Sequence, residues 1–460
     1  MPDYSSHPAS FKDPSGFIFF TNGNYYRQIN QVYSSDYEWL MSSGLYKTLT
    51  EKKLLVPHSE INENLTQSPD WYKTILPHQL PFISYPYEWS FDELKDAALH
   101  TLKIARTAME FGMMLKDATG FNLQFYNGRP IFIDTLSFAK YDAEKPWIAY
   151  RQFCECFLFP LMLQHYLRID GPKLLSLYIG GVPASLAARL LPLKSRMKLS
   201  VWLHVYLQNA VGSGNRSKSG DLKFSREKLS RLIDHLDSTI QSLHLKNNSK
   251  SAWNNYYDET ILGKNYLSEK EKIFRQWIND INEGIVLDIG CNEGYFSKII
   301  SERSREVIAI DSDSLCINSL YQVLKNNTEN RVLPLCVDIS NPTPATGFRN
   351  TERASFGERI TATTVVALAI IHHLVLSKNI PIHALAKMLA SLTTNNLIIE
   401  FVPLNDEKAK QLVASKQNYH VPYDENAFEN NFQPFFSIEK KQLIPGTGRS
   451  LYFMKKRKEG

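Results

Sequence analysis

The sequence has few of the residue patterns that mark secreted, metal-binding or membrane-spanning proteins. Its five cysteines are an odd number, and the Cys154–Cys156 pair lacks the spacing and the second Cys/His pair of a zinc site. The N-terminus has no basic segment followed by an apolar one, and the longest apolar stretch, 174–188, is too short to cross a bilayer. We therefore expect reduced thiols, a cytoplasmic location and no membrane partner.

An excess of charge of one sign is also missing. The 52 Lys and Arg residues against 47 Asp and Glu give a net charge of +5, so a nucleic-acid partner is possible but not favoured. The chain of 460 residues is too long for one ordinary core. Its patterns predict an α+β N-terminal region at 1–147, a helical region at 148–246 that continues it, and a third domain at 251–460. They do not define the oligomeric state.

Three local patterns predict structure in the N-terminal region. Two apolar segments, 17–20 and 25–29, flank an Asn-Gly pair, which predicts a β-hairpin. Residues 80–85 are expected to form another strand that ends before Pro86. From Phe91 onward, apolar residues recur every three or four positions, which predicts a helix with Ser90 as its N-cap.

The third domain alternates helix and strand patterns, which predicts an α/β fold with a mostly parallel sheet. A helix is expected at about 267–280. The predicted strands are 285–288, 307–311, 332–337, 364–371, 396–401, 435–443 and 450–454. The last two are joined by a short Pro-Gly-Thr-Gly turn, so we expect a seven-stranded sheet that ends in an antiparallel hairpin.

One glycine-containing loop gives the first indication of a ligand. An apolar strand leads into Leu-Asp-Ile-Gly-Cys-Asn-Glu-Gly at 287–294, and a helix pattern follows. Such a turn points backbone N–H groups at a ligand near the carboxyl end of a strand. A second strand ends in Asp311, 17 residues after Gly294. This spacing resembles class I S-adenosylmethionine (SAM) methyltransferases more than dehydrogenases, whose loop reads G-x-G-x-x-G.

The expected cofactor is therefore SAM, and the resemblance suggests a role for each strand end. Asp288 is expected to bind the methionine amino group, Asp311 the ribose hydroxyls, and Asp338 the adenine amino group. Glycines are expected where a side chain would collide with the ligand. The remaining residues predicted to bind the cofactor are Gly290, Cys291, Asn292, Gly294 and Ile339. Three acids that only cap turns are the alternative.

The catalytic candidates follow the fourth and fifth strands. His372 and His373 end the apolar stretch of the fourth strand, where a histidine can accept a proton from the group being methylated. Either histidine can instead bond only to a loop. Glu400, at the end of the fifth strand, is expected to orient the substrate or His372, or else to pair with a lysine. The Asn-Pro-Pro-Tyr type of motif is absent, which disfavours methylation of the adenine amino group.

Two segments around the sheet have open interpretations. The charged insertion at 341–359, between the third and fourth strands, can form a lid over an anionic or sugar substrate or merely solvated helices. The aromatic residues Trp253, Tyr256, Tyr257 and Tyr266 precede the sheet. They can cover the cofactor pocket or pack between domains.

The N-terminal region also contains a second motif. Asp117, Asn122 five residues later, a hairpin and then Asp134 resemble the catalytic loop and magnesium ligands of protein-kinase-like phosphotransferases. No histidine stands in the usual place before Asp117, Thr-Leu follows Asp134 in place of Phe-Gly, and no phosphate-binding glycine loop is evident. Arg27 is the available replacement for the strand lysine. A buried Asp/Asn network that braces the hairpin is the alternative.

Several phrases resemble one bacterial family across nearly the whole chain. They are 85–89, 132–138, 150–153, 287–294, 372–374 and 400–403, and the family consists of SAM-dependent methyltransferases related to a host-specific nodulation protein. The resemblance implies methyl transfer to an oxygen or nitrogen of a small or carbohydrate-like molecule. The alternatives are RNA (tRNA) methylation, and a bifunctional or pseudokinase protein that binds ATP in its partly kinase-like N-terminal region.

Overall fold

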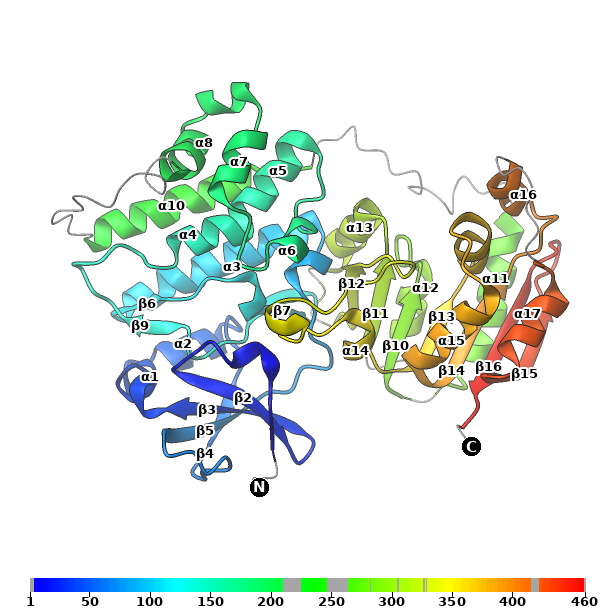
Figure 1. The fold of residues 1–460 in the computed structure, drawn as a ribbon, viewed down its shortest axis with the longest axis horizontal. Coiled ribbons are helices and arrows are strands. Elements are labelled where there is room, and N and C mark those ends of the chain that lie inside the picture. Colours follow the sequence, from blue (N-terminus) through cyan, green and yellow to red (C-terminus); the bar gives the residue numbers. More distant parts are fainter. Residues whose placement is uncertain are drawn as a thin grey trace. The chain divides into compact units, whose positions relative to one another are not determined.

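The chain forms two compact units in the computed structural model (Figure 1). The structure describes residues 4–209, 225–245, 264–281, 283–303, 306–325, 327, 329–414 and 422–458. Unit 1 comprises Met1–Ser249 together with Ala345–Ala354, and unit 2 comprises Lys250–Pro344 and Ser355–Gly460. The ten residues Ala345–Ala354 therefore belong to unit 1, although both of their flanks belong to unit 2.

Unit 1 begins with a five-stranded antiparallel sheet in the order β1-β2-β3-β5-β4. A long helix and two further strand pairs, β6–β9 and β7–β8, follow it. The strands are β1 Ser5–Ser6, β2 Gly16–Thr21, β3 Asn24–Asn30, β4 His58–Ile61, β5 Trp71–Pro77, β6 Met113–Leu115, β7 Leu123–Tyr126, β8 Arg129–Phe132 and β9 Phe138–Lys140. The α-helices are α1 Ser34–Ser42, α2 Leu45–Glu51, α3 Phe91–Glu110, α4 Tyr150–Phe153, α5 Phe159–Leu167, α6 Leu174–Leu177, α7 Ala184–Leu190, α8 Leu199–Val201 and α10 Arg226–Ser242.

Two of the local predictions for unit 1 are confirmed. The hairpin β2–β3 closes with Thr21 opposite Asn24, and Asn22 and Gly23 both adopt positive φ, as its two-residue turn requires. Helix α3 begins after Ser90, whose N–H donates to Glu93 Oε2 at 2.8 Å. The capping pattern and the apolar periodicity therefore located this helix correctly.

The strand predicted at 80–85 is wrong. The chain forms no strand there, and the strand of this region is β5, Trp71–Pro77. The backbone N–H of Ser84 donates to the side chain of Gln124 at 2.8 Å, and the Gln124 amide donates to the carbonyl of Ser84 at 3.0 Å. A buried side chain thus satisfies the backbone groups that a neighbouring strand would have paired.

Unit 2 contains a seven-stranded mixed sheet in the order β12-β11-β10-β13-β14-β16-β15, which confirms the predicted strand number. β10 to β14 are parallel, and β16 pairs antiparallel with both β14 and β15. The strands are β10 Ile285–Ile289, β11 Glu306–Asp311, β12 Val332–Cys336, β13 Ala362–Ala367, β14 Thr393–Phe401, β15 Phe436–Leu443 and β16 Ser450–Lys456. The helices are α11 Lys264–Ile278, α12 Tyr295–Ser301, α13 Ser314–Leu324, α14 Phe356–Arg359, α15 Ile382–Leu392, α16 Glu407–Ala414 and α17 Glu425–Phe432.

The sheet of unit 2 is buried, because apolar side chains on its strands pack with α11, α12 and α13 in one core. The strand β13 ends at Ala367, four residues earlier than predicted. Ala369 has a φ of 52°, and a strand cannot continue through this left-handed conformation. The two histidines therefore lie at the start of a short π-helix, His373–Ser377, rather than on the strand.

Two further features concern the whole described chain. Each of the five cysteines is a buried free thiol. A search of the described residues finds no helix with the length and apolar character needed to cross a membrane.

Candidate cofactor and active site

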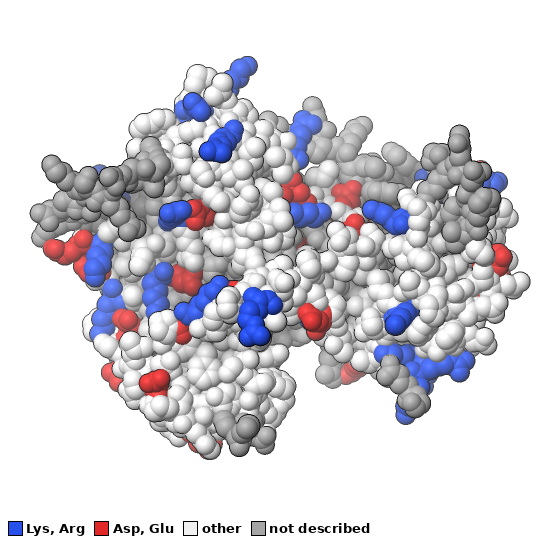
Figure 2. Space-filling view, in the orientation of Figure 1, with Lys and Arg blue, Asp and Glu red and all other residues white. Residues whose placement is uncertain are grey.

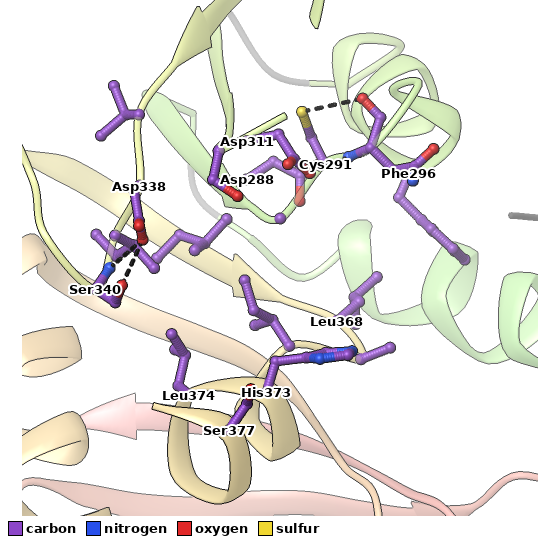
Figure 3. Close-up of a pocket in the computed structure, with 18 of the residues that line it drawn as sticks. Asp288, Cys291, Phe296, Asp311, Asp338, Ser340, Leu368, His373, Leu374 and Ser377 are labelled. Carbon is purple, nitrogen blue, oxygen red and sulfur yellow. Dashed lines mark hydrogen bonds between the residues drawn. The ribbon is translucent and has the colours of Figure 1, made fainter. Parts of the chain in front are cut away.

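A cavity of about 310 Å³ lies at the carboxyl ends of β10, β11, β12 and β13 in unit 2 (Figure 3). Asp288, Asp311 and Asp338 all line it, because neighbouring parallel strands present their carboxyl ends at the same edge of the sheet. The other lining residues are Tyr266, Lys270, Ile289, Gly290, Cys291, Asn292, Phe296, Ser312, Val337, Ile339, Ser340, Leu368, Ala369, Ile370, His373, Leu374, Ser377 and Lys378. The volume lies within the range of small-molecule sites, about 300–1,000 Å³.

Asp288 is a buried carboxylate at the floor of this cavity. It is 2% exposed, and its Oδ2 accepts a hydrogen bond from Ser297 Oγ at 2.6 Å. Burial raises the pKa of Asp288 to about 6, although the Ser297 hydrogen bond and the charge of Lys270 act in the opposite direction. Asp288 is therefore an anion above about pH 6, and a cationic ligand group beside it would be strongly favoured.

Asp311 is oriented by the loop that follows β10 and by the N-cap residue of α13. Its Oδ2 accepts the backbone N–H of Asn292 and its Oδ1 accepts the backbone N–H of Asp313, both at 2.9 Å. Burial raises the pKa of Asp311. Each carboxylate oxygen has two lone pairs, so the group can still accept hydrogen bonds from two adjacent hydroxyls.

Asp338 follows β12 and is oriented by Ser340. Its Oδ1 accepts the backbone N–H of Ser340 at 2.9 Å and the Ser340 hydroxyl at 2.6 Å. Its Oδ2 lies 3.9 Å from Lys378 Nζ. In Figure 3 Asp338 lies to the left of the Asp288 and Asp311 pair, and His373 lies below both. The adjacent Ile339 contributes an apolar wall.

The two glycines of the loop have different roles. Gly290 lines the cavity, has a φ of +74°, and would place a Cβ only 2.6 Å from Ile370 Cδ1. Gly294 does not line the cavity; its φ is +75° and its Cβ would lie 2.5 Å from Leu320 Cδ1. Its positive φ and its packing against α13 both favour glycine at position 294. Between them Asn292 has a φ of 52°, a conformation that asparagine tolerates well.

The two histidines occupy different environments. His373 lines the cavity, and burial together with Arg449 and Lys408 lowers its pKa to about 4. His372 is fully buried and does not line the cavity, and neither of its ring nitrogens has a hydrogen-bond partner among the described residues. Burial and the neighbouring His373 hold the pKa of His372 well below its ordinary value. Both rings are therefore neutral at pH 7, and only His373 faces the cavity.

Glu400 lies in a buried charge network beside the cavity but does not line it. Its Oε2 lies 2.5 Å from Lys270 Nζ, and its Oε1 accepts the Tyr266 hydroxyl at 2.6 Å. Arg449, also fully buried, donates to the Tyr266 oxygen at 2.9 Å and pairs with Asp406 at 2.8 Å. Burial by itself would raise the pKa of Glu400, but Lys270 and Arg449 hold it below its ordinary value. The predicted alternative of a pair between Glu400 and a lysine is the observed one.

The network includes cavity residues that sequence reasoning missed. Lys270, on α11, lines the cavity and is 3% exposed, although lysine is rarely buried. Its place on an amphipathic helix before the first strand gives no sequence signal, because its partner Glu400 is 130 residues away. Tyr266 does line the cavity, as one interpretation of the aromatic residues suggested. Trp253, Tyr256 and Tyr257 lie outside the described residues.

The residues of the second predicted motif, in unit 1, come together around an ion pair. Arg27 on β3 lies 2.7 Å from Asp134 Oδ1, and the other Asp134 oxygen accepts the Ser137 hydroxyl at 2.5 Å. Burial and the neighbouring Asp134 raise the pKa of Asp117, against hydrogen bonds from Asn122 and Gln152. Within the described ranges, no group of three or more His, Cys, Asp or Glu side chains is arranged to hold a metal ion.

Comparison with known proteins gives one relative across almost the whole length. The chain is 30% identical over 454 residues to the nodulation protein NoeA of Rhizobium meliloti strain 1021, covering 96% of this chain and 94% of NoeA. No protein-family model matches.

Part of the chain is similar to solved structures. Magnesium protoporphyrin IX methyltransferase ChlM of Synechocystis PCC 6803, with bound SAH, is 16% identical, and the match covers 42% of this chain and 84% of that one. The N-methyltransferase NodS of Bradyrhizobium japonicum WM9 is 11% identical, with 42% and 98% covered. Both TM-scores are 0.32, so these likenesses define neither the fold nor the activity.

Proposed function

The chain belongs to the family of the nodulation protein NoeA, and we propose that unit 2 is a SAM-dependent methyltransferase. The observation that carries the proposal is the cavity lined by Asp288, Asp311 and Asp338 at the ends of three neighbouring parallel strands. The acceptor is an oxygen or nitrogen of a small or carbohydrate-like molecule.

The residues that line the cavity fit the parts of SAM one by one. Asp311 would accept both ribose hydroxyls, and Asp338 with Ile339 would hold the adenine. Asp288, anionic and buried, would bind the methionine ammonium group, and the buried cation Lys270 would bind the carboxylate. When bound, SAM supplies a methyl group on a sulfonium centre, which is electrophilic without further activation.

The protein's part in the transfer is to position the acceptor and to take its proton. His373 is neutral at pH 7 because its pKa is lowered to about 4. Its imidazole can therefore accept a hydrogen bond from the acceptor hydroxyl or amine and hold that group in line for attack. We assign no substrate contact to His372, because it is buried and does not line the cavity, and Glu400 would act through Lys270 and Tyr266 rather than on the substrate.

A thermal-shift titration of the full chain tests the proposal. SAM and its demethylated product should both raise the unfolding temperature, since they bind the folded state. Asp311→Asn should abolish the shift. Asp424→Asn is the matched control, because the exposed Asp424 side chain caps α17, where asparagine is an equally good cap, and it does not line the cavity. No shift with the wild-type chain, or an unchanged shift with Asp311→Asn, would refute the assignment.

A second candidate function is nucleotide binding by unit 1. Two observations favour it: the side chains of Asp117, Asn122 and Asp134 are neighbours, and the strand pairs β6–β9 and β7–β8 lie around them. In a kinase-like site, an acid at position 134 would hold magnesium. Arg27 already neutralises Asp134 at 2.7 Å, which favours a pseudokinase. ATP with Mg²⁺ should raise the unfolding temperature of the wild type but not of Asp134→Asn. A shift of the same size in both would reject this candidate.

A further inference from the structure

Apolar side chains are unusually exposed on one helical part of unit 1. This part comprises α7, the 3₁₀ helix η6 (Leu193–Met197), α8 and the π-helix η7 (Trp202–Leu207), which pack against one another. The exposed fractions are 72% for Leu193, 85% for Met197, 64% for Leu199 and 48% for Trp202. Clusters of large apolar side chains that are exposed to solvent usually mark a site of interaction.

These apolar side chains are exposed although another face of the same helical segment already packs into the core. In the helical segment formed by α8 and η7, Val201 and Val205 are buried, so one face already packs inward. Leu199 and Trp202, three residues apart, share the opposite face, where a soluble helix ordinarily carries polar residues. The segment is thus apolar on both faces, and Leu199 and Trp202 on its outer face remain largely exposed among the described residues.

All of the charged residues in the stretch of sequence that carries these side chains are basic. Arg189, Lys194, Arg196 and Lys198 are exposed and form no ion pair in the described parts of the chain, although Arg196 and Lys198 stack on nearby tyrosines. Residues 171–220 contain seven Lys and Arg and no Asp or Glu, whereas 47 acids in 460 residues would place about five in such a stretch. In Figure 2 the projecting part at the top of the view carries Lys and Arg atoms among uncharged ones.

We propose that this surface docks on an anionic lipid bilayer. Leu193, Met197 and Trp202 would enter the interface between headgroups and acyl chains, while the lysines and arginines between them would contact lipid phosphates. Single-stranded nucleic acid is a less suitable partner, because its bases stack on aromatic side chains, and most of the exposed apolar side chains here are leucine and methionine. The proposed contact is peripheral, and it differs from the sequence-based expectation of no membrane partner.

Vesicle sedimentation of the full chain tests the proposal. The protein should bind vesicles of phosphatidylcholine with phosphatidylglycerol, and bind those of phosphatidylcholine alone far more weakly. The triple variant K194E/R196E/K198E should bind the anionic vesicles about 100-fold more weakly, since each basic residue near the surface contributes about 1 kcal/mol. The matched control is K52E/K103E/R129E, which makes the same charge change at exposed positions elsewhere in unit 1 and should bind as the wild type does.

The apolar side chains are tested separately. L193S/M197S should also weaken vesicle binding while leaving the unfolding temperature unchanged, because both side chains are exposed. Brominated lipid should quench the fluorescence of the wild type more than that of Trp202→Phe.

Equal binding to neutral and anionic vesicles, or an equal loss in the control variant, would overturn the proposal. The proposal would also be overturned if the wild type bound single-stranded RNA, the K194E/R196E/K198E variant did not, and neither protein bound vesicles. The test does not depend on methyltransferase activity.

Discussion

Replacing Asp288 by asparagine should make the protein more stable and at the same time remove its affinity for SAM. The carboxylate is 2% exposed, and its pKa rises from the ordinary 3.8 to about 6. A carboxyl whose pKa is raised on folding reduces stability at any pH above its unfolded pKa, and the reduction is complete above its folded pKa. At pH 7.5 the ionised group therefore costs about 3 kcal/mol of folding free energy.

Asparagine keeps the shape of Asp288 and can still accept the Ser297 hydroxyl, but it carries no charge. The unfolding temperature of the variant without ligand should rise by several degrees, at about 2–4 °C per kcal/mol for a unit of this size. Its affinity for SAM should fall about 10- to 100-fold, because a charge-assisted hydrogen bond to the ammonium group is lost. Scanning calorimetry and isothermal titration calorimetry measure the two effects independently.

The pH dependence separates this account from a purely structural role for Asp288. Wild-type affinity for SAM should be constant above pH 7 and fall about tenfold by pH 5, because protonation below pH 6 competes with binding. The affinity of Asp288→Asn should lack this step, whereas Asp424→Asn should retain it. A variant that is less stable than the wild type, or that binds SAM with unchanged affinity, would refute the reasoning.

The remaining predictions concern the buried groups beside the cavity. Lys270→Met should destabilise unit 2 by about 3–5 kcal/mol in urea denaturation, because it leaves Glu400 buried without its lysine. Adding Glu400→Gln should recover much of this loss of stability. Full stability of the single variant would contradict the observed pair. His372 has a pKa well below the value of about 6.5 that it has in the unfolded chain, so the unfolded chain binds more protons in acid. The free energy of unfolding should therefore be at its full value above about pH 6.5. Below that pH it should decline by up to about 1.4 kcal/mol per pH unit. His372→Phe should reduce that slope, as urea titrations at several pH values would show. Gly294→Ala should destabilise unit 2, because its Cβ would meet Leu320, yet leave the SAM affinity of the folded fraction unchanged; a selective loss of affinity would instead place Gly294 at the ligand.

The sheet of unit 2 could be located from sequence because each strand has its own local signal. Apolar runs that end in an acid, and the short Pro-Gly turn between β15 and β16, depend only on neighbouring residues. The prediction of a strand at 80–85 was wrong because the conformation of this segment depends on a residue distant in the sequence. Its backbone groups are satisfied by the side chain of Gln124, a partner that local patterns cannot reveal.

The candidate site divides in the same way. The three aspartates could be placed on one edge of the sheet, since parallel strands share their carboxyl ends. The partner of Glu400 could not be identified, because Lys270, Tyr266 and Arg449 come from distant parts of the chain. The early end of β13 at Ala367, which moves His372 away from the cavity and leaves His373 facing it, depends on the backbone conformation of Ala369.

The most direct test of the account is a crystal structure of the full chain with S-adenosylhomocysteine. We expect one molecule per chain, with its ribose hydroxyls bound by Asp311, its adenine beside Asp338 and its amino group on Asp288. A ligand bound elsewhere in the chain, or bound here without contact to Asp311, would contradict it.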